Sequence, residues 1–364
     1  MGASAGLQVR LRQSVPFALD VAFEAPAGSI TALFGPSGSG KTTVLRAIAG
    51  LHRMNDARVS CGAELWTDTA TRTYQPPHRR PVGFVFQDYG LFPHLTVREQ
   101  LALALGHRPV DERPARIDAL LQLASLQGLS DRHPAALSGG QQQRAALVRA
   151  LARDPAVLLL DEPFAAVDWA LRESLRRELV ALQRSLSLTL VLVTHDFEDV
   201  AKLASHLVVL DRGTVVAAGS VEELTSRNAV PGISGWHEPA VALDARVLAH
   251  EADRQLSLIA AGGLRLEVPT VPAPVGAPVR VQLAARDVIL ASHRPEGLSL
   301  HNMLEARVIA VEPAAHAALR LVHLEVGGTR VLSLVTADAA RKLSLAAGKP
   351  VLALIKAVAV EAFA

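Results

Sequence analysis

The chain has little cysteine and no long apolar run. Its single cysteine, Cys61, excludes an internal disulfide and fits a reducing compartment. The longest apolar runs, such as residues 156–160 and 190–193, are far shorter than the ~20 residues that a membrane-spanning helix requires. They are typical of buried strands, so any role at a membrane has to come through a partner.

The chain also lacks a large excess of positive or negative residues. The chain has 37 Lys and Arg against 35 Asp and Glu. A nucleic-acid-binding protein needs basic residues gathered on one face, so we predict no nucleic acid partner. The short pairs Arg79–Arg80 and Arg176–Arg177 are interpreted as solvated surface. Residues 1–7 lack a basic stretch followed by an apolar core, so we expect no signal peptide.

The order of patterns along the chain predicts two domains, and 364 residues, half of them hydrophobic, are enough for both. Between residues 29 and 212, short apolar runs alternate with helical stretches, which predicts an α/β layered domain. The strand signal disappears over about 96–147, where Thr96–Glu99 resembles a capping box, so we predict a helical insertion. Residues 229–241 contain several prolines and glycines and are interpreted as a linker.

After the linker, residues 242–364 are rich in valine and leucine, which predicts a small β-barrel. A faint repeat occurs there, because Ala245-Arg-Val-Leu-Ala249 returns as Ala306-Arg-Val-Ile-Ala310. Each copy is followed later by Gly-x-Pro-Val. Chance similarity is the alternative, since alanine and valine are common, and we prefer two related units in tandem.

Residues 35–42, Gly-Pro-Ser-Gly-Ser-Gly-Lys-Thr, fit the phosphate-binding loop (P-loop) pattern in full, between a predicted strand and a predicted helix. The glycines let backbone N–H groups wrap around phosphates, and the start of the helix adds partial positive charge. We predict that Lys41 reaches the β- and γ-phosphates of ATP and that the Thr42 hydroxyl binds Mg²⁺. The predicted nucleotide contacts are Gly35, Pro36, Ser37, Gly38, Ser39, Gly40, Lys41, Thr42 and Thr43.

Two acidic residues end the apolar run 157–160. A buried strand would deliver Asp161 to its carboxyl end, where the carboxylate can hold Mg²⁺ through water. Glu162 is predicted to be the general base that activates the attacking water. An apolar run that ends in two acids is a weak signal alone. Downstream of a P-loop it indicates an ATP-hydrolysing site.

The motif Leu137-Ser-Gly-Gly-Gln141 resembles the signature of ATP-binding-cassette (ABC) proteins, a branch of the P-loop NTPases. In that family the motif contacts the γ-phosphate held by the other subunit, so two nucleotides are sandwiched between two head-to-tail cassettes. The resemblance implies a homodimer in which each chain contributes Ser138, Gly139, Gly140 and Gln141 to its partner's site.

Other elements of the family occur in the expected order. Gln87 resembles the Q-loop glutamine, which senses Mg²⁺ and γ-phosphate. Asp168 resembles the D-loop aspartate, although Ala165-Ala-Val167 departs from the commoner Ser-Ala-Leu. His195, in Thr-His-Asp, resembles the switch histidine that contacts the γ-phosphate. The aromatic residue that normally stacks on adenine is missing at its usual spacing. Phe17 is the nearest candidate, and a core role for it is the equal alternative.

The part of the chain after the linker, residues 242–364 (the tail), narrows the resemblance to one branch of ABC proteins. Residues 83–97 are typical of the importer branch, and the segment from Ser299 resembles the start of a Mop-like (TOBE) oxyanion-binding fold. The whole is most similar to the ATP-binding subunits of molybdate importers. The resemblance implies a cassette over 1–228 and a β-rich OB-like domain with its Mop-like unit over about 298–364. Its candidate oxyanion ligands are Ser299, His301, Asn302 and Lys356, although His301 stands where the family usually has a basic residue, often Arg.

These resemblances imply an ATPase that uses ATP and Mg²⁺ and sits on the cytoplasmic face of the inner membrane. It would bind transmembrane permease subunits and act indirectly with a periplasmic or extracellular substrate-binding protein. The alternatives are the same motor for sulfate, ferric iron, tungstate or polyamine, a soluble ABC ATPase without a transport role, and an oxyanion-storing or regulatory protein. The complete motifs around Glu162 and His195 argue against a pure binder.

Overall fold

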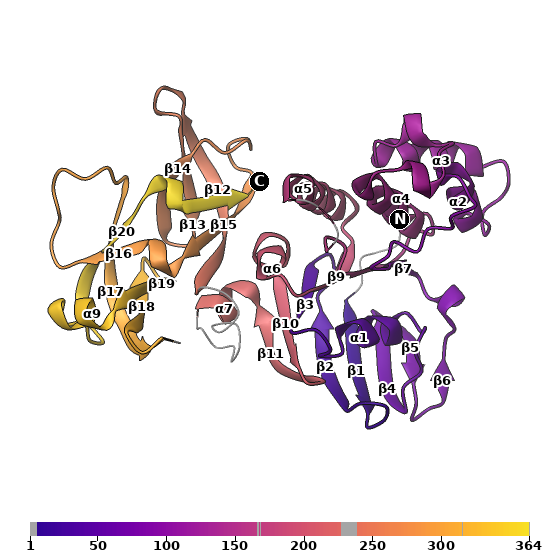
Figure 1. Cartoon of the computed structure of the whole chain (residues 1–364), viewed down its shortest axis with the longest axis horizontal. Helices are drawn as coiled ribbons and strands as arrows, with labels where there is room; N and C mark the ends of the chain where they lie inside the picture. The colour runs from indigo at the N-terminus through magenta and orange to yellow at the C-terminus, as the bar shows by residue number, and fades with distance from the viewer. Residues whose placement is uncertain (1–5, 166, 168, 227–238, 315, 364) are drawn as a thin grey trace. The chain divides into compact units, whose positions relative to one another are not determined.

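The computed structural model describes residues 6–165, 167, 169–226, 239–314 and 316–363. The chain divides into two compact units, Met1–Ala218 and Gly219–Ala364 (Figure 1).

The first unit is built on an eleven-stranded sheet with the order β6-β5-β4-β1-β2-β11-β10-β3-β9-β8-β7. Its strands are β1 (Leu7–Gln13), β2 (Leu19–Ala25), β3 (Ile30–Phe34), β4 (Asp56–Cys61), β5 (Glu64–Asp68), β6 (Thr73–Tyr74), β7 (Val82–Val85), β8 (Val157–Asp161), β9 (Thr189–Thr194), β10 (His206–Asp211) and β11 (Thr214–Ser220). Strands β10, β3, β9, β8 and β7 run parallel to one another. Strands β3, β8 and β9 are buried at every position, as the continuous apolar runs in the sequence predict.

Three helices of the first unit belong to the α/β layer: α1 (Lys41–Ile48), α5 (Trp169–Leu186) and α6 (Phe197–Leu203). The helical insertion contains α2 (Val97–Ala104), α3 (Arg113–Leu123) and α4 (Gly139–Leu151), which are drawn together in Figure 1. The predicted capping box is present at the start of α2, because the Thr96 side chain accepts from the Glu99 N–H and the Glu99 carboxylate accepts from the Thr96 N–H.

The second unit contains the short helices α7 (Val221–Ser226) and α9 (Ala337–Lys342) and two five-stranded sheets that share one apolar core. One sheet has the order β14-β13-β12-β15-β21 and the other β16-β20-β17-β18-β19. The strands are β12 (Ala240–Glu251), β13 (Leu256–Ala261), β14 (Leu264–Pro269), β15 (Pro278–Ala284), β16 (Val288–Ala291), β17 (Asn302–Pro313), β18 (Leu319–Val326), β19 (Thr329–Thr336), β20 (Pro350–Ile355) and β21 (Val360–Phe363).

The structure confirms the internal repeat. The β12–β13 ladder shifts register between Val247 and Ala249, and the β17–β18 ladder shifts at the equivalent positions, Val308 and Ala310. In each copy the preceding arginine donates to a glycine carbonyl of the Gly-x-Pro-Val segment, from Arg246 to Gly276 and from Arg307 to Gly348. Matching bulges and matching contacts are not expected from chance similarity in composition.

The two repeats exchange their last strands. Strand β16 follows the first copy along the chain but pairs with β20 of the second. Strand β21 ends the second copy but pairs with β15 of the first. The two Gly-Gly hairpins also meet, since a Cβ added to Gly263 would lie 1.7 Å from the Gly327 carbonyl oxygen. The copies therefore form one intertwined unit.

The start of the second unit differs from the expected boundaries. The chain divides at residue 218, before the predicted end of the cassette at residue 228. The reason is that α7 packs against β12, where the Ala242 N–H donates to the Thr225 hydroxyl. Strand β12 begins at Ala240, so the end of the predicted linker 229–241 is a strand. Residues 229–238 of that linker lie outside the described residues.

Candidate functional site

Three loops of the first unit leave the same edge of the parallel sheet. Phe34 at the end of β3 lies opposite Thr194 at the end of β9, and Asp161 at the end of β8 lies opposite Val193. Because these strands are parallel, their carboxyl ends share one edge. This register places the P-loop, Glu162 and His195 in consecutive loops at that edge.

The P-loop backbone needs glycine at its two ends. Gly35 has φ +156°, and a Cβ there would lie 2.1 Å from the Leu210 carbonyl oxygen. Gly40 has φ +100°, and its Cβ would lie 2.9 Å from a Leu19 methyl group. A larger residue at position 35 would have to displace the β10 backbone, and at position 40 the left-handed φ favours glycine. The loop is thereby held against the sheet before α1 begins at Lys41.

The Lys41 ammonium is folded into this loop. Its Nζ donates to the carbonyl oxygens of Gly35 and Pro36, both at 2.8 Å. Burial lowers the pKa of Lys41, while the nearby carboxylates of Glu162 and Asp161 act in the opposite direction. A buried ammonium beside the start of a helix favours a bound anion, which is the chemistry that a phosphate site requires.

The remaining loop residues differ in exposure. Ser37 and Gly38 are exposed, Thr43 is half-buried, and Ser39 is buried with a hydroxyl that has no hydrogen-bond partner in the structure.

The residue after Lys41, Thr42, contacts a carboxylate from the end of β8. The Thr42 hydroxyl donates to Asp161 Oδ1 at 2.9 Å. Burial raises the pKa of Asp161, and the hydrogen bond from Thr42 opposes that shift. Hard oxygen donors of this kind fit Mg²⁺, which takes one or two protein oxygens together with waters and phosphates. The predicted third member, Gln87, lies exposed two residues beyond the end of β7.

Glu162 and His195 are brought together. His195 Nδ1 lies 3.2 Å from Glu162 Oε2, and the carboxylate side chain is 18 % exposed while the imidazole is 55 % exposed. Glu162 has a positive φ of 47°, and its N–H donates to the Val193 carbonyl at 3.0 Å. A non-glycine residue in this conformation at the end of a strand is held by its surroundings, which is common at functional sites.

The signature residues lie at the start of α4. Ser138 is the N-cap, and its pairing with Gln141 forms a second capping box. Gly139 is exposed, and a Cβ there would meet no heavy atom within 4 Å. Gly140 is buried in the first turn of the helix. The motif therefore presents an open helix start on the helical part of the unit. Asp168, the predicted D-loop residue, lies outside the described residues.

Phe17 lies beside the P-loop. A Cβ added to Gly40 would lie 3.4 Å from Phe17 Cε2, and the side chain is 37 % exposed. The Gln13 amide donates to the Phe17 carbonyl at 3.3 Å, which fixes the turn between β1 and β2. Its part in stacking on adenine stays a prediction.

Two parts of the chain match known families. Residues 19–165 match the ABC transporter family, and residues 298–362 match the TOBE domain. The chain is 40 % identical to a molybdenum import ATP-binding protein, ModC, of Aromatoleum aromaticum, over 94 % of this chain and 90 % of that protein. It is 41 % identical to the protein of the same name from Albidiferax ferrireducens, over 97 % and 95 % of the two chains.

The chain belongs to the ABC transporter ATP-binding proteins. Solved structures of this family show the same cassette. CbiO1 of Clostridium perfringens, part of an ABC transporter complex, matches with a TM-score of 0.55 and 26 % identity over 62 % of this chain and 92 % of that chain. The cassette MJ0796, solved as a dimer with ADP and phosphate, matches with a TM-score of 0.50 and 29 % identity over 59 % and 98 %. No helix among the described residues of this ABC protein is long and apolar enough to cross a membrane.

The four tail candidates of this ABC protein are not equivalent. Asn302 is 3 % exposed, and its amide pairs with β14, accepting from the Glu267 N–H and donating to the Glu267 carbonyl. Ser299, His301 and Lys356 are exposed. Lys356 directly follows Ile355, which pairs with Asn302 across the β17–β20 ladder. The structure thus uses the asparagine side chain to join the repeats and leaves the other three at the surface.

The interpretation of two arginine pairs as solvated surface is wrong for one member of each. Arg80 is 1 % exposed and donates to the carbonyls of Ala47 and Ile48 at the end of α1. Arg176 is 2 % exposed and binds Asp199 on α6, together with Glu173 and Glu198. These guanidiniums are buried because tertiary partners satisfy them, and no local pattern in the sequence reveals those partners.

Sequence reasoning also missed Arg172 and Asp196. Arg172 on α5 donates to the Asp196 carboxylate at 2.7 Å. The only local signal was the position of Asp196, directly after His195 in the Thr-His-Asp motif.

Proposed function

We propose that this chain is the ATP-hydrolysing subunit of an importer that takes up molybdate through a separate membrane permease. The motor role is supported by the meeting of the P-loop, Glu162 and His195 at one sheet edge. The cargo is supported by near full-length similarity to proteins named for molybdenum import. Sulfate, ferric iron, tungstate or polyamine remain the alternative cargoes for the same motor.

Within the site, each residue would have a distinct role. The P-loop amides and Lys41 would hold the β- and γ-phosphates of ATP. Thr42 and Asp161 would hold Mg²⁺, with Gln87 reaching it from the next loop. When bound, the ion supplies positive charge against the phosphate oxygens. Glu162 would accept the proton of the attacking water, and His195, 3.2 Å away, would orient that carboxylate and contact the γ-phosphate.

A second copy of the chain would complete the site. The start of α4, with Ser138 and Gly139, is open to solvent and offers hydroxyl and N–H donors to an anion. In a head-to-tail dimer it would face the γ-phosphate held by the partner. The D-loop residue Asp168 is proposed at the same interface. The dimer with ADP and phosphate formed by MJ0796 supports this arrangement.

The permease would dock on the segment after Gln87, residues 88–93, at the cytoplasmic face of the inner membrane. Leu91 is half-buried in this segment, while Phe92 and Pro93 are exposed. A periplasmic or extracellular substrate-binding protein would deliver cargo to the permease and would not touch this chain.

Uptake measurements test the cargo directly. In a strain lacking other molybdate importers, deletion of this chain is expected to abolish high-affinity uptake of labelled molybdate and to leave sulfate uptake unchanged. Wild-type chain should restore uptake, and the matched Glu162→Gln variant should not, because it retains the fold but lacks the base. Loss of sulfate uptake instead would assign the other cargo. Normal uptake of every candidate ion would refute the transport role.

We also propose an oxyanion-binding role for the tail, carried by Ser299, His301 and Lys356 beside Asn302. Calorimetric titration of molybdate, tungstate and sulfate into the full chain, with ADP and Mg²⁺ saturating the P-loop, is expected to give heat with molybdate. Lys356→Ala should weaken that binding about tenfold, since a charge-assisted contact is lost. The exposed Lys342→Ala is the matched control. The absence of heat with all three ions would remove this role and leave the tail as a dimerisation module.

A further inference from the structure

Glu162 and His195 come from separate loops, and a shared sheet edge alone does not fix how those loops face each other. Each residue lies just beyond the last residue of its strand, Asp161 for β8 and Thr194 for β9. Beyond that point the Glu162 N–H still donates to the Val193 carbonyl at 3.0 Å, and this bond holds Glu162 but does not reach His195. Their 3.2 Å contact therefore depends on what anchors the two loops.

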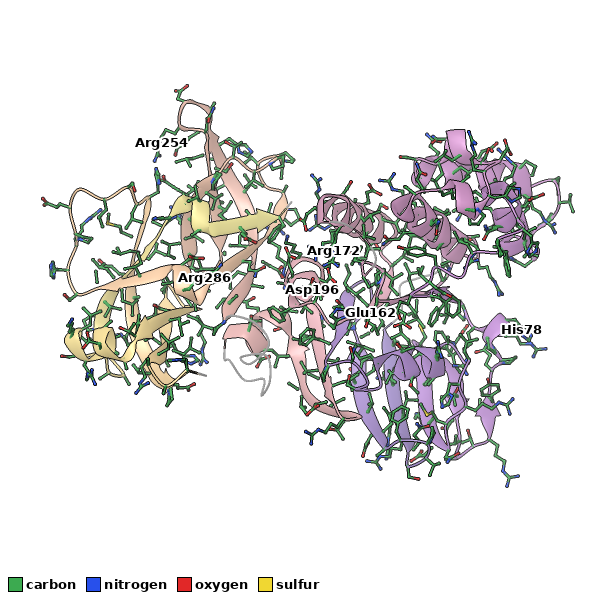
Figure 2. All side chains as sticks on the ribbon, viewed as in Figure 1. His78, Glu162, Arg172, Asp196, Arg254 and Arg286 are labelled. Atoms are coloured by element: carbon green, nitrogen blue, oxygen red, sulfur yellow. The ribbon has the colours of Figure 1, made fainter. Side chains whose placement is uncertain are left out.

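One side chain reaches both loops. Arg172, in the first turns of α5, donates through Nη1 to Asp196 Oδ2 at 2.7 Å and through Nη2 to the Phe164 carbonyl at 2.8 Å. Asp196 is the residue after His195, and Phe164 lies two residues after Glu162. Figure 2 shows Arg172, Asp196 and Glu162 close together in the first unit. A planar guanidinium can make both bonds at once with fixed geometry.

Each anchored group is rigidly connected to its catalytic neighbour. The Asp196 N–H donates to the Thr194 hydroxyl, and its Oδ1 caps α6 by accepting from the Glu198 N–H. On the other loop, the Ala165 N–H donates to the Glu162 carbonyl, closing a turn around Phe164. A shift of Asp196 or Phe164 would therefore disturb the position of His195 or Glu162.

We propose that Arg172 is a positioning residue for ATP hydrolysis, which sets the contact between Glu162 and His195 by joining their loops. This inference rests on the proposed roles of those two residues. Arg172 would touch neither ATP nor the attacking water and would act through Asp196 and the Phe164 carbonyl. A loss of geometry of this kind lowers the rate of the chemical step more than the binding of substrate.

A purely structural ion pair is a poorer explanation of Arg172, because the structure assigns that task to its neighbour. Arg176 is 2 % exposed and binds the buried Asp199, whereas Arg172 and Asp196 are 21 % and 25 % exposed. Solvent screens the pair of Arg172 and Asp196 more than the pair of Arg176 and Asp199, so the former contributes less to stability. The geometry of Arg172 therefore matters mainly for where its partners point.

Kinetics of Arg172→Ala test the inference. We expect kcat for ATP to fall between about tenfold and a hundredfold, since misplaced catalytic groups cost this much. The KM for ATP should change less than about twofold, because the P-loop contacts are untouched. The thermal midpoint should fall by less than about 5 °C. Arg177→Ala, which removes an exposed arginine from the same helix, should leave all three unchanged. An unchanged kcat in Arg172→Ala would refute the positioning role.

A double-mutant cycle separates positioning from general damage. Asp196→Asn can retain the α6 cap through its amide oxygen but loses the charge that binds Arg172 and that faces Arg176 Nη2 at 3.8 Å. If Arg172 acts through Asp196, the double variant should be no slower than Arg172→Ala, whereas independent effects would multiply. Arg172→Lys can make one of the two bonds and should be intermediate. Strictly multiplicative effects would count against the proposal.

The outcome for Glu162→Gln distinguishes a failure of the positioning role from a failure of the proposed ATPase site. If that variant is inactive and Arg172→Ala has normal kcat, the positioning role fails and the proposed ATPase site stands. If Glu162→Gln retains full turnover, the assignment of the base fails first.

Discussion

Replacement of Glu162 by glutamine is expected to reduce ATP turnover by at least about a hundredfold, the lower range of a general-base contribution. Glutamine has nearly the same shape and can still accept a hydrogen bond from His195, which lies 3.2 Å from the carboxylate. Its amide cannot take a proton from water at neutral pH. The change therefore removes the chemistry while leaving the loop conformation, including the bond from the Glu162 N–H to the Val193 carbonyl.

The same variant should accumulate as an ATP-bound dimer. Nucleotide sandwiched between a P-loop and a partner's signature helix holds two chains together until it is hydrolysed, so blocking hydrolysis stabilises the dimer by mass action. Size-exclusion chromatography with light scattering, with and without ATP and Mg²⁺, measures this directly. Glu24→Gln removes an exposed carboxylate from β2 and should behave as wild type. Undiminished ATPase activity in Glu162→Gln would mean that another group is the base. A monomer in the presence of ATP would contradict the shared site.

The sequence predicted which site residues lie together where the pattern is local. A P-loop between a strand and a helix, and acids at the end of an apolar run, are contiguous patterns, and parallel strands then bring them to one edge. The 2.9 Å contact between Thr42 and Asp161 joins residues far apart in the chain, yet it follows from that rule. The glycine at position 35 was predicted for phosphate approach. The structure adds a second reason, the Leu210 carbonyl that a side chain would strike.

The missed features depend on partners that no local pattern specifies. Arg80 and Arg176 were predicted to lie at the surface because arginine is usually exposed. Their burial depends on carbonyls and carboxylates from other elements. In the tail, the repeat was visible in the sequence, but the exchange of β16 and β21 between the copies was not. A strand can pair with any free sheet edge of similar hydrogen-bonding capacity. Which edge it joins depends on the connecting turns and the hydrophobic pattern.

Replacement of Lys41 by methionine is expected to weaken ATP binding by about ten- to a hundredfold, because a charged hydrogen bond to phosphate contributes roughly 1.5–3 kcal/mol. Lys41 is 4 % exposed. Methionine retains most of its buried apolar stem and removes the ammonium. Burial lowers the pKa of Lys41, and a bound phosphate would oppose this shift because its negative charge favours the charged ammonium. The affinity lost should therefore reflect the charge at Nζ more than the packing of α1.

Calorimetric titration with a non-hydrolysable ATP analogue and Mg²⁺ gives the affinity, and circular dichroism gives the thermal midpoint. Arg10→Ala, which removes an exposed cation from β1 of the same unit, is the matched control for net charge. Its affinity should equal that of the wild type, since the effect of Lys41 arises from contact and an exposed distant charge is screened by salt. Equal affinity in wild type and Lys41→Met would contradict the cradle formed by Gly35, Pro36 and the start of α1, even with Glu162 confirmed as the base. Under the proposed roles, binding and hydrolysis at this site depend on different residues, and the two variants would separate them.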